Sequence, residues 1–322
     1  MPMPDRASFM PDRMNPRQTE GQHELAALAD RLAVSEGYTE TPLPGLRLLR
    51  SSNDLDDVPV LYRPGAVFVL QGSKRGFLGG DTFVYDAHHY LAVSVPVPFR
   101  MESRASFKAP LLALYMDFDL SVTAELIELA ALRREEPQAK ARSLVSSPME
   151  PGVRGTLLRL LTALGDPLET AALGPQLLRE LHYRVLSGAQ APQLIAALRA
   201  TSAGVGRGLA FIRRSYREPI TIRVLAAEAG MSVPSFHSRF RELTGSTPLN
   251  YIKSMRLHEA RLLMARESCS VARAATAVGY VSSSQFSREF KRHFGRTASE
   301  EVRWMRAHLG ELAQPHEPVT LR

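Results

Sequence analysis

The chain has few of the residues that build disulfides, membrane spans and metal centres. Its 322 residues include one cysteine, so no disulfide can form within the chain, which suits a reducing compartment. No stretch offers the roughly 20 uninterrupted apolar residues of a membrane-spanning helix, and residues 1–22 lack the continuous apolar run of a secretory signal. We therefore expect a soluble, cytoplasmic protein without a membrane partner, with residues 1–22 as a disordered tail.

Candidate metal ligands are also scarce. A divalent metal needs three or four converging donors, but between residues 58 and 118 the only histidines are His88 and His89. Adjacent side chains of a strand point to opposite faces, so these two cannot hold one ion from a strand. We expect both in a turn or at a rim, and we predict no metal, no cofactor and no catalytic residue. The single cysteine, Cys269, is expected to be structural.

The most informative feature is a segment that the chain contains twice. Residues 230–240 are echoed by residues 279–290, and the echo continues from residues 245–247 to residues 295–297. Each copy begins with an alanine-rich stretch that ends at a glycine, which can adopt a positive φ, and a serine that can cap a second helix follows. The pattern predicts a helix, a tight turn and a helix in both copies.

The second helix of each copy has an inner and an outer face. Phe236 and Phe240, like Phe286 and Phe290, lie four residues apart and share one face, which we assign to the core. A short helix that is anchored by one face and presents polar and cationic side chains on the other fits the major groove of DNA. The outward positions are Pro234, His237, Ser238 and Arg239 in the first copy and Ser284, Gln285, Arg288 and Lys291 in the second.

A long helix is expected between the copies. Residues 248–264 have no interior glycine or proline and repeat apolar residues at helical spacing. A rigid connector would set the two outer faces about one DNA turn apart, roughly 34 Å. Charge concentrates here too, because residues 205–310 carry 18 Lys and Arg against 8 Asp and Glu (+10), whereas the other residues carry 22 against 25 (−3). A basic segment favours a polyphosphate partner, although solvated basic helices are common.

Three stretches of this part of the chain match a known pattern: Leu225 to Ser232, Arg256 to Leu263 and, above all, Val278 to Gly295. On these stretches, residues 207–306 resemble the DNA-binding domain of the AraC/XylS family of bacterial transcription regulators. The resemblance implies seven helices, with two helix-turn-helix units joined by a long helix. It also implies base contacts from the positions of Pro234, His237, Ser238, Ser284, Gln285 and Arg288.

The outward residues of the two copies differ in chemistry. Arg288 can form a bidentate contact with guanine, and Gln285 can do so with adenine, whereas His237 and Ser238 discriminate less between bases. The competing interpretation is that Arg288 contacts a phosphate, so that its loss would weaken binding to all DNA sequences alike.

The chain departs from the family after the second copy. Thr297 is followed by Ala298, where the family usually has proline. The last helix is therefore expected to begin less sharply, with Ser299 as its cap and Glu301 in its first turn.

The first two thirds of the chain have a different pattern. Short β-like runs between turns rich in Gly, Asp and Pro predict a small antiparallel barrel or sandwich, and helical patterns follow them. The strands are expected at residues 58–62, 66–70, 82–85, 90–95 and 111–116, and the helices at about 120–134, 149–164, 174–187 and 190–201. On Thr41 to Leu46, Val69 to Arg75, Gly79 to Asp86 and Tyr90 to Ser94, residues 37–132 resemble the cupin-like N-terminal domain of one AraC-type subgroup.

An effector site in this region is expected from the resemblance. A pocket would be lined by Phe68, Leu70 and Phe83, which alternation places inside the barrel. Lys74 and Arg75 could meet an anionic ligand, although a solvated hairpin tip is the favoured interpretation.

These patterns together predict an α+β protein of two domains. Residues 23–200 would form a cupin-like antiparallel barrel with a helical extension, residues 205–310 an all-α domain with two helix-turn-helix units, and residues 311–322 a flexible tail. We interpret the chain as a sequence-specific AraC-type transcription regulator that binds promoter DNA, contacts RNA polymerase and responds to a small-molecule effector. Homodimerisation and the choice between activation and repression stay open.

Two other functions are consistent with parts of the pattern. An architectural DNA-binding protein would bind with little sequence discrimination, which the outward Gln285 and Arg288 disfavour. A cupin enzyme fused to a DNA-binding domain would require a bound metal.

Overall fold

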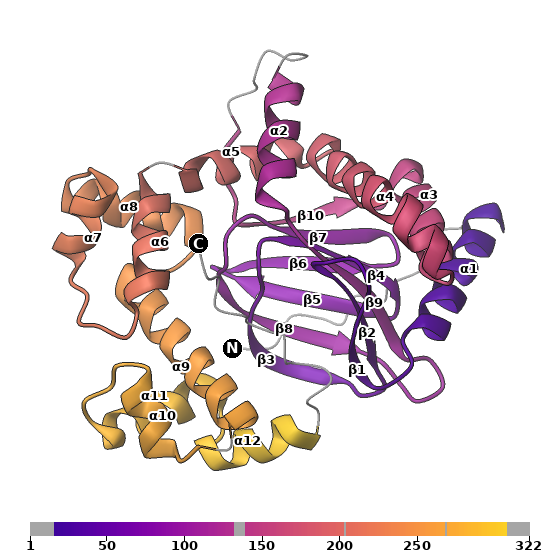
Figure 1. The fold of residues 1–322 in the computed structure, drawn as a ribbon. Coiled ribbons are helices and arrows are strands. Elements are labelled where there is room, and N and C mark those ends of the chain that lie inside the picture. Colours follow the sequence, from indigo (N-terminus) through magenta and orange to yellow (C-terminus); the bar gives the residue numbers. More distant parts are fainter. Residues whose placement is uncertain (1–15, 132–138, 203, 268, 308–322) are drawn as a thin grey trace, which may run out of the picture.

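The computed structural model describes residues 16–131, 139–202, 204–267 and 269–307. Figure 1 shows a curled sheet at the centre, helices of the N-terminal part against one side of it, and the C-terminal helices beyond the opposite side. The tail expected at residues 311–322 and the first 15 residues of the one expected at residues 1–22 lie outside the described residues. Among the helices that are described, none is long and apolar enough to cross a membrane.

The described residues form a ten-stranded sheet. Its strands are β1 Gly37–Glu40, β2 Leu46–Ser51, β3 Leu55–Leu61, β4 Gly65–Gln71, β5 Ser73–Leu78, β6 Asp81–Asp86, β7 His89–Val93, β8 Pro98–Arg104, β9 Leu111–Asp117 and β10 Leu144–Pro148. Their order is β1-β2-β9-β4-β7-β6-β5-β8-β3, and β10 also pairs with β7. The pairings are antiparallel, for example Val67 opposite Tyr115, so the predicted α+β class with an antiparallel, barrel-like first part is confirmed as a curled half-barrel.

The five predicted strands are present, and of the five further strands all but β10 carry charged residues. Strand β5 contains Lys74 and Arg75, and β8 contains Arg100, Glu102 and Arg104. Arg75 lies opposite Glu102 in the register of these two strands, and its Nη2 donates to Glu102 Oε2 at 2.6 Å. Charges that pair across strands in this way interrupt the apolar alternation by which strands are recognised.

Both faces of the sheet are buried, and each supports its own core. Along β4, Val67 and Val69 join one apolar cluster, whereas Phe68 joins the other. The second cluster includes Leu25 and Leu157 from helices. Because both faces are covered, β4 is apolar along almost its whole length instead of alternating with polar residues.

The helices of the N-terminal part are α1 Pro16–Leu32, α2 Leu120–Ala131, α3 Pro151–Ala163, α4 Pro167–Ser187 and α5 Ala191–Ser202. Residues 16–22 belong to α1, so the prediction of a disordered tail is wrong for them: α1 packs on the sheet through Leu25 and Ala29. Helix α4 begins seven residues before the predicted start at residue 174. Its cap is Asp166, whose Oδ1 accepts from the Leu168 and Glu169 amides at 2.8 and 2.9 Å.

Seven helices make up the C-terminal part, as the resemblance implied. They are α6 Val205–Ser215, α7 Ile222–Ala229, α8 Val233–Thr244, α9 Pro248–Glu267, α10 Val271–Ala277, α11 Ser283–Phe294 and α12 Ala298–Ala307. Helix α9 is the predicted connector, with 20 residues and a length of about 30 Å at 1.5 Å per residue. The two predicted helix-turn-helix units are α7 with α8 and α10 with α11, which we call the first and second units.

Both units are attached to the sheet by polar contacts. Tyr251 Oη in α9 donates to the Pro96 carbonyl at 2.5 Å, close to the first unit. Near the second unit, Arg261 Nη1 donates to the Pro59 carbonyl at 3.3 Å, and Arg100 Nη1 of β8 donates to the His293 carbonyl at 3.2 Å. The C-terminal helices are therefore packed against strands β3 and β8 and the loop before β8, in addition to their covalent connection to α5.

Candidate nucleic-acid interface

Local capping fixes the geometry of the first unit. Thr221 caps α7 and Gly230, with φ of 65°, ends it. Ser232 then caps α8, where its Oγ accepts from the Ser235 amide at 3.4 Å. Phe236 and Phe240 are fully buried, with ring centroids 5.5 Å apart, so the opposite face of α8 is turned outward.

The second unit repeats these devices with a longer turn. Ser270 caps α10, Gly279 adopts φ of 87°, and the Ser282 Oγ accepts from the Gln285 amide at 3.2 Å. Phe286 and Phe290 are fully buried, as in the first unit. The predicted turn glycines, serine caps and inward phenylalanines are confirmed in both units.

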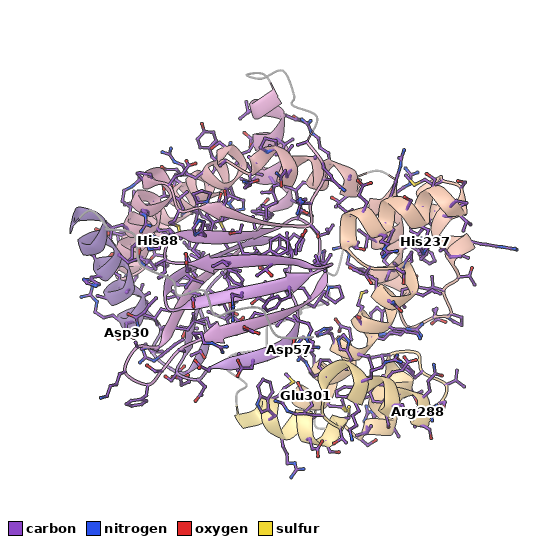
Figure 2. The ribbon with its side chains drawn as sticks, turned by 180° about the vertical axis from the view of Figure 1, so that it is seen from behind. Asp30, Asp57, His88, His237, Arg288 and Glu301 are labelled. Atoms are coloured by element: carbon purple, nitrogen blue, oxygen red, sulfur yellow. The ribbon has the colours of Figure 1, made fainter. Side chains whose placement is uncertain are left out.

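The outward positions are accessible in both units. Figure 2 labels His237 in the first unit and Arg288 in the second. His237 is partly exposed, and the other seven predicted contact residues are exposed: Pro234, Ser238, Arg239, Ser284, Gln285, Arg288 and Lys291. Their contact with DNA stays a prediction, but each side chain is presented as that prediction requires.

The cations of this region fall into two groups. Arg239, Arg288 and Lys291 are exposed and form no hydrogen bond or salt bridge with any described residue, although Lys291 lies close enough to Glu300 to help lower the pKa of that carboxyl. By contrast, Arg207 Nε donates to the Glu228 carbonyl at 2.9 Å, and Lys253 Nζ lies 3.2 Å from Glu289 Oε1. On the outward faces of α8 and α11, Arg239, Arg288 and Lys291 are therefore available to an external anion.

Gln285 is held in place by an acidic neighbour. Its Nε2 donates to Glu289 Oε1 at 3.2 Å, and Tyr280 Oη donates to Glu289 Oε2 at 2.8 Å. Burial opposes the charge of Glu289, but hydrogen bonds from Tyr280, Gln285 and Lys253 hold its pKa below the usual value. The second Nε2 hydrogen of Gln285 remains free to donate to the acceptor of an adenine edge, and its Oε1 remains free to accept from the donor of that edge.

Arg256 of α9 has a structural role that sequence reasoning missed. Its guanidinium donates to three carbonyls: Tyr216 at 2.6 Å, Glu218 at 2.7 Å and Gly279 at 3.2 Å. These carbonyls belong to the α6–α7 connection and to the turn of the second unit. A side chain of α9 therefore holds the α6–α7 connection against the turn of the second unit. In the sequence, Arg256 stands out only as part of the family pattern.

Helix α12 begins more sharply than predicted. Thr297, not Ser299, is its cap: the Thr297 Oγ1 accepts from the Glu300 amide at 3.3 Å, and the Thr297 amide donates to Glu300 Oε2 at 2.8 Å. This reciprocal pair is a capping box. Thr297 and Glu300 thus start the helix at Ala298 without the proline that the family usually has there.

The three predicted effector-site residues do not face one cavity. Phe68 and Leu70 are buried in the cluster beneath α1, α3 and α4, whereas Phe83 belongs to the cluster on the other face of the sheet. Alternation misassigned the faces because both are apolar along β4, where Val67 and Val69 share the side of Phe83. Contact of any of these residues with an effector stays a prediction.

The prediction of a hairpin tip is wrong for Lys74 and Arg75, which both lie inside β5, and the prediction that they are solvated agrees only with Arg75. Half of the Arg75 side chain is exposed, whereas Lys74 is only 2% exposed. Lys74 Nζ donates to the hydroxyl of Tyr115 at 2.7 Å and to that of Tyr62 at 3.4 Å. Burial raises the pKa values of both tyrosines well above the usual value, so they stay neutral beside the lysine.

His88 and His89 lie at the β6–β7 turn, as predicted. Asp86 Oδ1 accepts from their backbone amides at 2.8 and 3.0 Å, which fixes the turn. Within the part of the chain that the structure describes, no three His, Cys, Asp or Glu side chains are placed to hold a metal ion. Cys269 is partly buried and packs against the core of the second unit.

Comparison with known families assigns both parts of the chain. Residues 42–193 match the model of the AraC-type transcriptional regulator N-terminus, and residues 225–303 match that of a helix-turn-helix domain. The two matches coincide with the sheet and its helices and with the two helix-turn-helix units.

Individual relatives share shorter stretches. RclR, the RCS-specific HTH-type transcriptional activator of Escherichia coli strain K12, is 41% identical over 80 residues, or 25% of this chain and 28% of RclR. The HTH-type transcriptional activator RhaS of Escherichia fergusonii is 29% identical over 117 residues, or 34% of this chain and 42% of RhaS. The chain therefore spans less than half the length of these two relatives.

One similar solved structure extends over both parts. The apo form of a ToxT variant from Vibrio cholerae strain SCE256 has a TM-score of 0.54 at 12% identity, covering 83% of this chain and 98% of ToxT. At this identity the likeness concerns the fold alone.

Proposed function

We propose that this chain, which belongs to the AraC family of transcriptional regulators, binds promoter DNA sequence-specifically through both helix-turn-helix units and controls transcription initiation. The observation that carries the proposal is the placement of three exposed cations. Arg239, Arg288 and Lys291 lie on the outward faces of α8 and α11, while neighbouring cations are used inside the fold. A pair of short helices with such faces, held by a rigid connector, suits two successive major grooves.

The proposed contacts follow from side-chain chemistry. Arg288 reads guanine through two parallel hydrogen bonds, and Gln285 reads adenine. The remaining neutral positions, Pro234, His237, Ser238 and Ser284, line the grooves with weaker discrimination. Arg239 and Lys291 neutralise phosphates, which adds affinity that depends on salt but not on sequence.

The two domains would have different roles. Residues 205–310 read DNA, and residues 23–200 receive a small-molecule signal and mediate any homodimer contact. The polar contacts between strands β3 and β8 and the helices around the second unit give a route by which the sheet can bias the reader. RNA polymerase is the proposed partner in the cytoplasm, and activation is favoured because RclR and RhaS are named activators.

Selection of bound DNA from a random library by the purified full chain, at near-physiological salt, tests this proposal. We expect a bipartite motif whose half-sites are centred about one helical turn, roughly 34 Å, apart. Arg288→Ala should degrade the half-site read by the second unit and leave the other half intact. Salt-sensitive binding without any motif would contradict sequence-specific reading and favour an architectural protein.

A further inference from the structure

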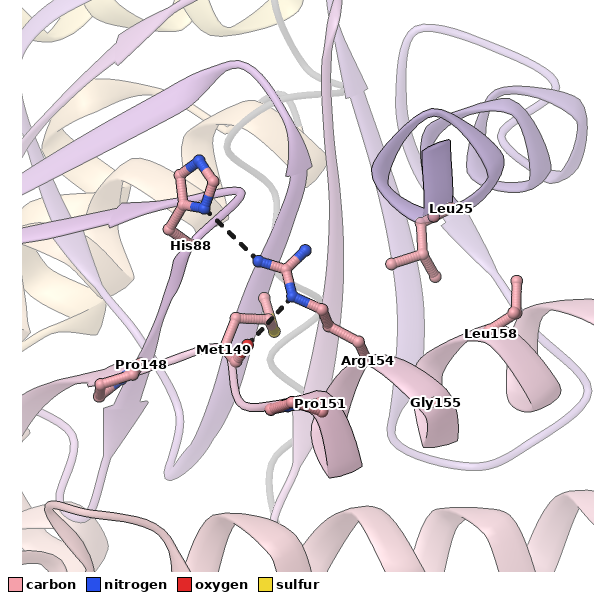
Figure 3. Close-up of a pocket in the computed structure, with 9 residues that line it drawn as sticks. Leu25, His88, Pro148, Met149, Pro151, Arg154, Gly155 and Leu158 are labelled. Carbon is pink, nitrogen blue, oxygen red and sulfur yellow. Dashed lines mark hydrogen bonds between the residues drawn. The ribbon is translucent and has the colours of Figure 1, made fainter. Parts of the chain in front are cut away.

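A cavity of about 410 Å³ lies on the face of the sheet that is covered by α1 and α3. Figure 3 shows it between α1, the first turns of α3, the β6–β7 turn and the end of β10. Its walls are mainly apolar and include Leu25, Met149 and Leu158. The volume falls within the roughly 300–1,000 Å³ of small-molecule pockets. None of the predicted effector-site residues lines it.

Two glycines keep this space open. Gly21 in α1 and Gly155 in α3 both line the cavity, and a Cβ atom at either position would meet nothing within 4 Å. Glycine inside a helix costs roughly 0.5–1 kcal/mol relative to alanine, and neither position needs it to avoid a clash. The consequence of glycine at these two positions is therefore open space in the cavity that Arg154 lines.

Arg154 provides a cation at the wall of the cavity, and its hydrogen-bond acceptors are neutral groups. Its Nε donates to the Met149 carbonyl at 3.1 Å, its Nη1 to Gln22 Oε1 at 2.6 Å, and its Nη2 to the Ala87 carbonyl at 2.9 Å. The only other contact is with His88 Nδ1 at 3.5 Å. No carboxylate among the described residues forms a salt bridge with it; burial lowers the pKa of the guanidinium, and the more distant Asp86 carboxylate offsets part of that effect.

The end of α3 adds to the positive potential. The cavity includes Pro151 in the first turn of this helix, and the N-cap residue Glu150 makes no side-chain cap bond. The free amides of a helix N-terminus favour an anion. Arg154 and the amides of this helix end favour an anion and the Glu150 carboxylate opposes it, so Arg154 is the main attraction on one side of an otherwise apolar space.

We propose that this cavity binds a small amphipathic carboxylate, with the carboxylate on Arg154 and the apolar chain against Leu25 and Leu158. An anion would compensate the half-buried guanidinium, and charge-assisted bonds of this kind contribute about 1.5–3 kcal/mol. That such a ligand acts as the effector rests on the proposed regulatory function. Binding of the carboxylate to the cavity does not depend on that function.

The site is connected to the sheet through Gln22. Its Oε1 accepts from Arg154, while its Nε2 donates to the Leu70 carbonyl of β4 at 2.6 Å. A ligand that draws the guanidinium toward the cavity would weaken the bond that fixes α1 to α3. The docking of α1 on the sheet is therefore the element that ligand binding would alter.

Calorimetric titration of the full chain with octanoate, and with octan-1-ol as the uncharged equivalent, tests the site. We expect octanoate to bind and octan-1-ol to bind about 10- to 100-fold more weakly, the ratio that corresponds to one charge-assisted contact. Arg154→Gln should weaken octanoate binding by a similar factor. Arg159→Gln, on the same helix but outside the cavity, is the matched control and should bind as the unchanged chain does.

A second variant separates occupancy of the cavity from loss of the charge. Gly155→Leu places a side chain in the cavity at a position where a Cβ atom meets nothing within 4 Å, and it leaves Arg154 in place. It should abolish octanoate binding while the circular dichroism spectrum and melting temperature are retained. Equal binding of octanoate to Arg154→Gln, equal binding of octan-1-ol, or no binding at millimolar octanoate would each overturn the proposal. DNA selection on the same samples is read independently, so failure of the site and failure of the regulatory function are distinguishable.

Discussion

The two helix-turn-helix units share their fold but are anchored to the sheet by different chemistry. Six residues after the glycine that ends the second helix, the first unit has Tyr251 and the second has Glu301, and both side chains are 1% exposed. Tyr251 donates directly to the Pro96 carbonyl at 2.5 Å. Glu301 instead lies 3.3 Å from Arg261 Nη1, which in turn donates to the Pro59 carbonyl.

The comparison shows that the repeated fold requires a polar anchor in each unit but does not determine which residues form it. Each unit uses a buried polar donor to satisfy a backbone carbonyl of the N-terminal part, Tyr251 in the first unit and Arg261, held by Glu301, in the second. A phenol does so while neutral, since burial raises the pKa of Tyr251. The Arg261–Glu301 pair does so only while both charges are present. The anchor of the second unit should therefore respond to mutation more strongly than the anchor of the first.

Removal of the anchors gives the largest expected contrast. Glu301→Ala leaves Arg261 charged in a fully buried position and should cost about 3–5 kcal/mol of unfolding free energy. Tyr251→Phe removes one neutral hydrogen bond and should cost about 0.5–1.5 kcal/mol. Urea unfolding, followed by the fluorescence of the single tryptophan, Trp304 in α12, and by circular dichroism, measures both.

A double variant tests whether charge is the cause. Arg261→Met with Glu301→Leu replaces the pair by apolar side chains of similar size, which is often close to neutral for buried pairs. Stability should then return toward that of the unchanged chain. A double variant as unstable as Glu301→Ala would instead mean that shape, and not the uncompensated charge, determines the loss.

The turn glycines give the next contrast. A Cβ at Gly279 would lie 2.2 Å from the Arg217 carbonyl oxygen, whereas at Gly230 the nearest atom is the Arg207 Nη2, at 2.8 Å and at the end of a flexible side chain. Both glycines have positive φ, which costs roughly 1–2 kcal/mol for another residue. Displacing packed backbone adds roughly 2 kcal/mol, so Gly279→Ala should cost about 3–4 kcal/mol and Gly230→Ala about 1–2 kcal/mol.

The same urea titrations measure this pair. If the two alanine variants were equally unstable, the close approach of the 216–218 segment to the second unit would not be a rigid contact. Arg256, which joins that segment to Gly279, would then have no fixed geometry to preserve.

The pH dependence of stability should also differ between the units. The equivalent of Leu243 in the second unit is His293, and burial, together with Arg261, Arg100 and Arg292, lowers the pKa of His293 to about 4. Its ring Nε2 lies 3.3 Å from that of His258. The unfolded chain binds the proton near pH 6.5, so the stabilisation is complete above that pH and is lost as the pH falls toward 4.

His293→Leu tests this assignment by giving the second unit the residue of the first. Each pKa unit corresponds to about 1.4 kcal/mol, so His293 should account for about 3 kcal/mol of the stability lost between pH 6.5 and pH 4. The leucine variant should show a correspondingly flatter profile over this window when urea midpoints are measured at several pH values. If the leucine variant kept the same pH dependence of stability, the titrating group would be another residue. His182 is one example, because burial lowers its pKa too.

The sequence predicts best what is encoded over a few neighbouring residues. Gly230 and Gly279, the serine caps and the phenylalanine pairs act within one or two turns, so both units could be located from spacing alone. The Thr297 capping box is equally local, but attention to the missing proline at Ala298 led to the wrong cap. Predicted helix boundaries are therefore wrong where two local sequence signals compete.

Properties that depend on packing were less accessible. Lys74 sits on a charged strand of a type that usually faces water, and only the fold shows that it points between Tyr62 and Tyr115. Phe68 and Phe83 were placed together because a sheet with both faces covered has no polar side to indicate its interior. The attachment of Arg261 to Pro59 joins residues far apart in the chain, which no local pattern can indicate.

The smallest expected contrast concerns DNA reading, where the units differ at their outward positions. Counted from the inward phenylalanines, Arg288 of the second unit is matched by Ser238 of the first. A bidentate contact with guanine is worth about 1–3 kcal/mol of discrimination, so Arg288→Ala should weaken operator binding by about 5- to 150-fold. Ser238→Ala should cost less than about 1 kcal/mol, because a single hydroxyl discriminates poorly between bases.

Fluorescence anisotropy with the selected operator, and with operators altered in one half-site, measures both variants and identifies the mechanism. If Arg288 reads a base, its alanine variant loses affinity for the intact operator but little for one whose matching guanine is already replaced. If Arg288 instead contacts a phosphate, all operators weaken alike and the salt dependence becomes shallower by about one counterion. The second result would move sequence discrimination to Gln285 and remove the main difference in reading between the two units.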